Sequence, residues 1–211
     1  MTLSHTNSSV RLQAALAIGT HPDDRFVEPL IARCAIEPDF YVRDMLTWAL
    51  TRHPAALTVP RLIAELRDER AQARSQALHT LSKIGDRAAW PAITRALLTD
   101  ADDQVARTAW RTAVALAPED DADERSALAA VLATQFGRGD RETHLSLSRA
   151  LVALGDTIEP VLDTAANHRD PGVRRHVAAT ARLLRDPEAA FELGVEAAKR
   201  VYALGPTNQE H

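Results

Sequence analysis

Two sets of side chains in this sequence have types and a spacing that could support chemistry. Asp44 and Trp48 are four residues apart, so on a helix a carboxylate would lie beside an aromatic ring, as in part of an active site. The second set consists of arginines, whose guanidinium groups bind carboxylate and phosphate through paired hydrogen bonds. Its members are Arg107, Arg111, Arg149, Arg175 and Arg182. The elements that hold these residues decide whether either set can act together.

Other catalytic or metal-binding patterns do not occur in the sequence. The 8 histidines are scattered, and none stands beside another ligand at metal-binding spacing. Cys34 is the single cysteine, so the chain has no disulfide framework, and we interpret Cys34 as a small buried residue. Nucleophile-elbow, phosphate-loop and dinucleotide-binding motifs are missing as well. We therefore predict no catalytic residue, no metal and no cofactor.

The composition favours a folded, helical and cytoplasmic protein. The 211 residues are 45% hydrophobic and only 4% aromatic, and they are rich in Ala and Leu, which lose little side-chain freedom in a helix. The formal charge of −4 argues against a general nucleic-acid binder, because phosphate contacts need clustered cations. The first residues do not resemble a signal peptide, and no apolar run approaches the roughly 20 residues that span a bilayer.

An internal repeat sets the elements that would position the candidate residues. The stretch DFYVR at 39–43 is echoed by NSSVR at 7–11 and DPGVR at 170–174, with weaker echoes between them. The fourth residues of the six copies, which we call the anchors, are Val10, Val42, Ala73, Val105, Thr143 and Val173. A second mark is a proline that stands 13 or 14 residues before an anchor, at Pro29, Pro60, Pro91 and Pro160. Two marks in one register indicate a repeated unit.

Each unit is expected to form two helices. Proline is tolerated in a first turn, so it marks the first helix. An Asp or Asn three residues before the anchor is a favourable N-cap for the second helix. Turn signals at Gly19, His53–Pro54, Gly85 and Gly155 predict where several second helices stop. Apolar residues recur at helical spacing, and a lone pair of short helices cannot bury them, so we expect the pairs to stack in an array.

These marks resemble those of HEAT-repeat proteins and look closest to the short-unit bacterial type first described in phycobilin lyases. The resemblance rests on the prolines and on the Asp-x-x-Val-Arg starts at 39–43 and 170–174, and it covers roughly residues 7–185. It implies an all-α fold, a right-handed α–α superhelix. The unit that begins DDADERSAL departs from the pattern because it is longer and has no proline, and Ala106 replaces the usual arginine.

We divide the chain as one domain over residues 1–211. Its predicted parts are an N-terminal half-repeat at 7–20, helical pairs at 24–53, 56–85, 88–117, 122–155 and 158–185, and a capping helix at 187–204.

A stripe of candidate partner-binding residues follows from this division. The resemblance implies that the second helices line a concave surface. Residues two, six and nine positions after each anchor share one stripe, off the apolar face. The candidates on this stripe are Asp44, Trp48, His79, Arg107, Arg111, Arg149, Arg175 and Arg182. The arginines would either hold an anionic ligand or pair with acids on neighbouring helices.

The arginines directly after the anchors suggest a structural role. They are Arg11, Arg43, Arg74 and Arg174. Each could reach an acid or a carbonyl group of the next unit and so form a ladder that holds the stack together. An exposed pair of this kind is worth only a few tenths of a kcal/mol.

Three functions remain open at this stage. The leading hypothesis is a non-enzymatic scaffold or adaptor that binds an acidic or phosphorylated segment of another protein on its concave face. The resemblance also admits a HEAT-like DNA-alkylation glycosylase or nucleic-acid binder, in which Asp44 and Trp48 would face the base beside the arginines. A third possibility is a chromophore attachment factor like the phycobilin lyases.

Overall fold

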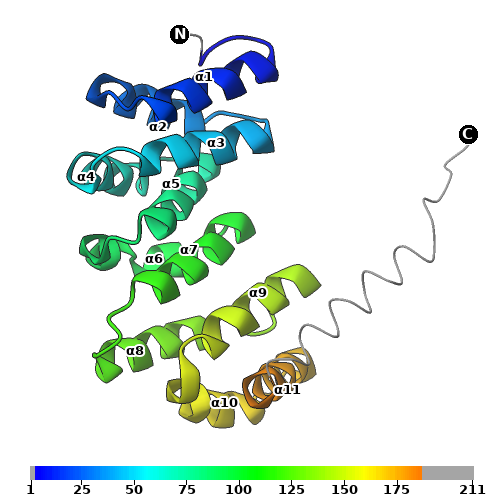
Figure 1. The fold of residues 1–211 in the computed structure, drawn as a ribbon. Coiled ribbons are helices and arrows are strands. Elements are labelled where there is room, and N and C mark those ends of the chain that lie inside the picture. Colours follow the sequence, from blue (N-terminus) through cyan, green and yellow to red (C-terminus); the bar gives the residue numbers. More distant parts are fainter. Residues whose placement is uncertain (1–2, 187–211) are drawn as a thin grey trace, which may run out of the picture.

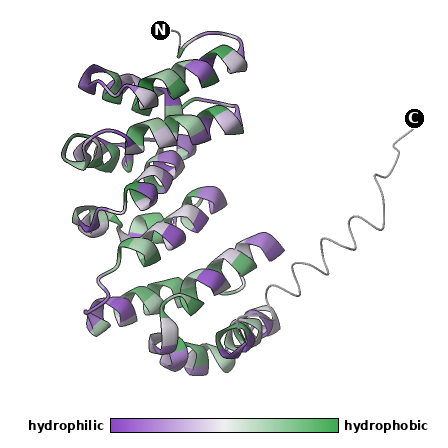
Figure 2. Cartoon of the chain, in the orientation of Figure 1, coloured by the Kyte–Doolittle hydropathy of each residue, from purple (hydrophilic) through white to green (hydrophobic). Residues whose placement is uncertain are grey.

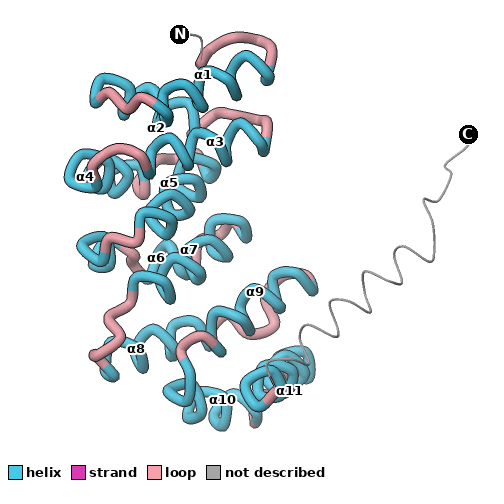
Figure 3. Tube along the Cα trace, viewed as in Figure 1, coloured by secondary structure: helices cyan, strands magenta, loops and turns pink. Residues whose placement is uncertain are grey.

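Helices are the only regular elements in the described part of the chain. The computed structural model describes residues 3–186, and Figure 3 shows helices joined by loops along all of this range. The predicted all-α class is therefore confirmed. The predicted capping helix at 187–204 lies outside the described residues. No helix within residues 3–186 is both long and apolar enough to cross a membrane.

The helices fall into two sets. The second helices of the units are α1 (Ser8–Thr20), α3 (Phe40–Thr51), α5 (Ala71–Ile84), α7 (Asp103–Leu116), α9 (Arg141–Val152) and α11 (Pro171–Arg185). The first helices are α2 (Val27–Cys34), α4 (Ala55–Glu65), α6 (Arg95–Leu98), α8 (Ala122–Ala133) and α10 (Glu159–Ala166). Short 3-10 helices are η1 (Asp24–Phe26), η2 (Arg87–Ala92) and η3 (Gly155–Ile158).

The units stack in series rather than around a centre. Each second helix packs on the next, from α1 through α3, α5, α7 and α9 to α11. Each second helix after α1 also packs on the first helix of its own unit. Figure 1 shows this order as a progression from α1 at one end of the array to α11 at the other. The fold is an all-α, HEAT-like solenoid.

One apolar core runs along the stack. Figure 2 shows hydrophobic and hydrophilic residues mixed along every helix, as expected when each helix buries one face. The buried cluster extends from Leu3 to Val177 without a break. Trp110 is completely buried, and its Nε1 donates a hydrogen bond of 2.8 Å to the Leu98 carbonyl. Cys34 is buried in the same core, as predicted.

Most second helices begin as predicted. An Asp or Asn side chain accepts a hydrogen bond from a free backbone N–H in the first turn, which satisfies a donor that has no partner inside the helix. These caps are Asn7, Asp39, Asp102, Asp140 and Asp170. Helix α5 is the exception, because Arg70 provides no side-chain cap. Asp68 instead accepts from the Arg70 N–H at 2.7 Å.

Two of the four prolines lie in the first turn of a first helix, as predicted. Pro29 and Pro160 lie in the first turns of α2 and α10. Pro60 lies inside α4, which begins directly after Pro54, and the prediction of a first-turn position is wrong there. Pro91 lies inside η2 rather than at the start of α6. Because proline has no N–H to donate, the chain forms a 3-10 segment at Pro91 and leaves α6 only four residues long.

Helix α1 ends at Thr20, directly after Gly19, so the stop predicted near Gly19 is confirmed, although Gly19 is not itself the C-cap. It lies inside α1 and is buried. A Cβ atom at this position would be 2.2 Å from Cζ3 of Trp48, so only glycine lets α1 and α3 approach this closely. Gly85 and Gly155, by contrast, have φ angles of 72° and 69°, as expected for glycines that follow helices.

Candidate binding groove

A groove of about 710 Å³ lies across α3, α5 and α7. Much of its lining comes from rows in which residues are three or four positions apart and therefore share a helix face. The rows are Phe40 and Asp44 on α3, Ala71, Ser75, His79 and Lys83 on α5, and Gln104, Thr108 and Arg111 on α7. The groove thus lies on the polar stripe beside the apolar faces that hold the helices together.

Buried hydroxyl groups set the register between successive second helices. The pairs are Thr47–Thr80 at 3.4 Å, Ser75–Thr108 at 3.1 Å and Ser148–Thr180 at 2.8 Å. The Thr112 hydroxyl also donates to the Leu78 carbonyl at 3.0 Å. The α5 and α7 contacts follow the same order along both helices, so these helices run side by side in one direction. Of these residues, Ser75 and Thr108 also line the groove, and sequence reasoning did not identify these contacts.

One end of the groove is cationic. Lys83 and Arg111 are exposed and form no ion pair with any residue in the range 3–186. The Arg111 Nε and Nη2 atoms are held by the Arg107 carbonyl and the Thr108 hydroxyl, both at 3.3 Å. Burial lowers the pKa of Arg111, and the charge of Arg107 lowers it further. An anion that binds such a guanidinium stabilises its positive charge in place of the water that burial has removed.

His79 lies among these charges. Burial lowers the pKa of His79 below its ordinary value, and the cations Lys83 and Arg111 lower it further. The charge of Asp44 acts against this and raises the pKa of His79. The imidazole is therefore uncharged at neutral pH and can donate or accept one hydrogen bond at each nitrogen.

The groove also contains two carboxylates. The Asp102 side chain caps its own helix, because it accepts a hydrogen bond from the Val105 N–H at 3.0 Å. Asp44 is exposed, and no described residue forms a hydrogen bond with its side chain. On the same wall, Arg43 donates to the Glu37 and Pro38 carbonyls at 2.8 Å. The cations that form no ion pair in the described range therefore lie at the Lys83–Arg111 end of the groove.

The structure brings three predicted residues together and separates the others. Asp44, His79 and Arg111 line the groove. Trp48 is outside its lining; the ring packs over Gly19 of α1 and is 37% exposed. The Asp44 carboxylate and the Trp48 ring therefore face different surroundings, although they share a helix.

The structure also separates the arginines of the predicted strip from one another. Arg107 forms an ion pair with Glu142 on α9, as the interpretation of pairing between neighbouring helices predicts. Arg149, Arg175 and Arg182 are exposed on α9 and α11, away from the groove. They form no ion pair with other residues of the described range. Only Arg111 of this set lines the groove.

Lys83 and Phe40 are among the groove residues that the predicted site did not include. Each continues a row that was identified: Lys83 is four residues after His79, and Phe40 is four before Asp44. Extending the stripe by one turn in each direction would have found both. That signal was present in the sequence.

The arginines after the anchors form a ladder that confirms the structural prediction in part. In Arg11, Arg43, Arg74 and Arg174, the Nη1 atom donates to the carbonyls six and five residues earlier. These carbonyls belong to the loop before the arginine's own helix. Only Arg11 and Arg74 also reach an acid of the next unit, Glu37 and Asp100. The ladder therefore mainly clamps loops.

Ala106 is the unit without this arginine, and Arg138 takes over part of its role. The carbonyl six residues before Ala106 belongs to Asp100, and Arg138 Nη2 donates to it from the loop of the next unit. Arg138 also forms an ion pair with Asp103 at 2.8 Å. A guanidinium thus reaches the expected carbonyl from the opposite direction.

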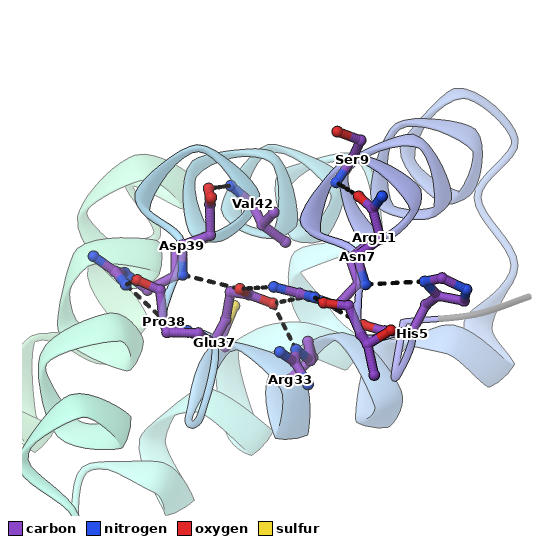
Figure 4. Close-up of polar contacts among 12 residues, drawn as sticks. His5, Asn7, Ser9, Arg11, Arg33, Glu37, Pro38, Asp39 and Val42 are labelled. Atoms are coloured by element: carbon purple, nitrogen blue, oxygen red, sulfur yellow. Dashed lines mark hydrogen bonds and ion pairs between the residues drawn. The ribbon is translucent and has the colours of Figure 1, made fainter.

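Glu37 is the centre of the N-terminal part of this ladder, as Figure 4 shows. Its side chain is completely buried and accepts from Arg11 Nε and Nη2 and from Arg33 Nε, each at 2.7 Å. The Asp39 N–H donates to it at 2.9 Å. Burial by itself raises the pKa of Glu37, but these hydrogen bonds outweigh it and lower the pKa to about 2.

Two histidines also meet between α9 and α11. The rings of His144 and His176 stack with centroids 4.2 Å apart. Burial and the neighbouring His144 lower the pKa of His176 to about 4, and its Nδ1 accepts from the Gly137 N–H at 3.1 Å. Among the described residues, no group of three or more His, Cys, Asp or Glu side chains could hold a metal ion. The pair serves to pack two helices.

Comparison with known proteins agrees with this architecture. Residues 28–117 match the family model of HEAT repeats, and this range includes the helices that carry the groove. The search of curated proteins gave no match. HEAT repeats generally mediate interactions between proteins and are typically non-enzymatic. Residues 28–117 therefore belong to the HEAT-repeat family, and the same serial packing of helices continues to Arg185.

Proposed function

We propose that this chain is a non-enzymatic scaffold or adaptor that binds an acidic or phosphorylated segment of a partner protein in the groove. One observation carries the proposal. Lys83 and Arg111 face the same groove without an acid partner in the described range, although the chain has a net charge of −4. In an acidic protein rich in ion pairs, two unpaired cations at one site indicate a ligand that supplies the missing anions.

The local environment strengthens such an interaction. Arg111 is partly desolvated and held by the Thr108 hydroxyl, so its planar guanidinium is already oriented. An anion bound there interacts through a lower effective dielectric than at an open surface. His79 adds a neutral hydrogen-bonding group beside the two charges.

The arrangement supports binding over catalysis. A glycosylase of the kind considered above would use an acid and an aromatic ring in one pocket. Asp44 lines the groove, but the Trp48 ring fills the space above Gly19 instead. This placement supports the scaffold hypothesis and gives no specific reason for an enzyme or a chromophore lyase.

Charge reversal at the groove tests the proposal. The double variant Lys83→Glu/Arg111→Glu is expected to lose partners that the wild-type chain retains in pull-downs from its native host. The loss should be matched by the weakening of wild-type binding when salt is raised, because the contact is ionic. Quantitative mass spectrometry of the retained proteins measures both effects.

A control separates the groove from overall charge. Arg67→Glu/Arg95→Glu makes the same change in net charge at two exposed arginines outside the groove. This control should retain the partners. Equal losses in both double variants, or no loss in either, would contradict binding at the groove.

A further inference from the structure

Large hydrophobic side chains are exposed at one wall of the groove. Phe40 lines the groove and is 65% exposed. Tyr41 and Ile36, beside it in the chain, are 73% and 55% exposed. The Phe40 and Tyr41 rings meet edge to face with centroids 5.6 Å apart, and the Arg43 guanidinium lies 5.9 Å from the Phe40 ring centre. Aromatic residues that are exposed beside a groove are typical of contact surfaces.

This apolar wall and the cationic end lie at opposite ends of the groove. The contact of Thr47 with Thr80 fixes the register of α3 and α5. Phe40 is seven residues before Thr47, and Lys83 is three residues after Thr80. Ten residues of helix rise about 15 Å. With an interhelical spacing of about 9 Å, the two ends are roughly 18 Å apart.

An extended peptide fits this distance. At about 3.3 Å per residue, 18 Å corresponds to five or six residues of extended chain. A segment of that length could place one side chain on Phe40 and another between Lys83 and Arg111. The polar side chains between the two ends, such as Ser75 and Thr108, line its path.

We propose, on the basis of the function proposed above, that the groove recognises a bipartite extended segment of a partner protein. An acidic side chain binds at Lys83 and Arg111, and an apolar or aromatic side chain about five residues away packs on Phe40. The two unlike ends fix the direction in which the segment lies.

The anion is a carboxylate rather than a phosphoryl group. The groove contains the carboxylates of Asp44 and Asp102 as well as its cations. A phosphoryl group carries nearly two negative charges at neutral pH, and the acids would repel it more strongly than they repel a single carboxylate. A pair of unpaired cations beside these acids is therefore better matched to Asp or Glu side chains of the partner.

Synthetic peptides test the proposal on the full chain. The probes are fluorescein-labelled peptides of 14 residues, made of Gly and Ser, with a Glu-Glu pair and one Phe separated by one, five or nine residues. Further probes lack the Phe, lack the Glu pair, or carry phosphoserine in place of the Glu pair. Fluorescence anisotropy at low salt measures the affinities. The peptide with a five-residue spacing is expected to bind about tenfold more tightly than the other spacings and than the peptide without Phe.

Two variants assign the ends of the peptide. Phe40→Ala should remove this tenfold advantage and leave the binding of the peptide without Phe unchanged. Leu16→Ala is the matched control, because it removes an exposed apolar side chain on α1 outside the groove. It should change no affinity. Lys83→Glu/Arg111→Glu should weaken every peptide that contains the Glu pair by at least tenfold, and circular dichroism confirms that each variant folds.

The outcomes separate this inference from the function on which it rests. If the Glu peptides bind without any dependence on spacing or on Phe40, the bipartite segment is wrong and the acidic-segment function stands. If neither the Glu peptides nor the phosphoserine peptide binds the wild-type chain, both are wrong. If only the phosphoserine peptide binds, the carboxylate assignment is overturned.

Discussion

At the scale of single residues, Glu37 is a buried carboxylate whose contacts join three segments of the chain. A completely buried carboxylate is costly unless each oxygen is paired, and Arg11, Arg33 and the Asp39 N–H supply the partners. Because the network joins α1, α2 and the loop before α3, it orients the N-terminal units relative to each other. Removing one partner leaves the other charges buried without compensation.

We predict that Glu37→Gln lowers the free energy of unfolding by about 3 kcal/mol at pH 7. The pKa of Glu37 is about 2 in the folded chain and 4.5 ordinarily, so ionisation stabilises the fold fully above about pH 5. This contribution is lost as the pH falls towards 2. The difference between wild type and variant should therefore shrink over that window, measured by urea denaturation.

Glu69→Gln is the matched control for this experiment. Glu69 stands 26 residues after Arg43, as Glu37 stands 26 residues after Arg11, but its side chain is exposed. Its replacement should cost less than about 0.5 kcal/mol. A difference for Glu37→Gln that stays constant from pH 7 to pH 2 would contradict the assigned pKa.

At the scale of the elements, the first helices differ more than the second ones. The second helices α3, α7, α9 and α11 share an Asp N-cap, and all of them bury an apolar face. The first helices range from 12 residues in α8 to four in α6. The position of the proline explains part of this, because it leaves a first turn intact but removes a hydrogen bond elsewhere.

We predict that Pro60→Ala stabilises the chain by about 1–3 kcal/mol. The substitution restores an N–H inside α4 and removes the clash of the proline ring with the preceding turn. Pro29→Ala is the control, because Pro29 is also exposed but lies in a first turn, where its N–H would have no helical partner. That variant should change the stability by less than about 0.5 kcal/mol. Thermal and urea unfolding compare the two, and equal effects would show that α4 is not strained at Pro60.

At the scale of the whole molecule, serial stacking determines how far a local change spreads. Each unit contacts mainly its neighbours, so stability is approximately a sum of units and of the interfaces between them. The groove spans only α3, α5 and α7, and a partner bound there would stabilise this part first.

We predict that a core cavity loosens the part of the array in which it lies. Leu50→Ala in α3 and Leu151→Ala in α9 remove equivalent, completely buried side chains, each at a cost of about 2–5 kcal/mol. Hydrogen exchange followed by mass spectrometry should show faster exchange in α1 to α5 for the first variant and in α7 to α11 for the second. Equal acceleration along the whole chain in both variants would indicate a single cooperative core instead.

The features that could be predicted from the sequence are those that depend on neighbours along the chain. A cap such as Asp39 needs only the residues three positions ahead, and Asp44, His79 and Arg111 were found because helical spacing places them on one stripe. The buried network around Glu37 could not be predicted, because its partner Arg11 lies 26 residues away in the sequence. The position of Trp48 depends in the same way on Gly19, on another helix.

The amino-acid sequence by itself therefore determined the helices, their N-caps and the repeated stacking, since these follow from spacing and local hydrogen bonding. Only the tertiary structure decided which polar residues share one groove, that Arg107 pairs with Glu142 while Lys83 and Arg111 meet no acid there, and that Trp48 covers a glycine. The physical reason is that contacts between helices depend on their register and on side-chain volume, and neither is encoded in the spacing of a single helix.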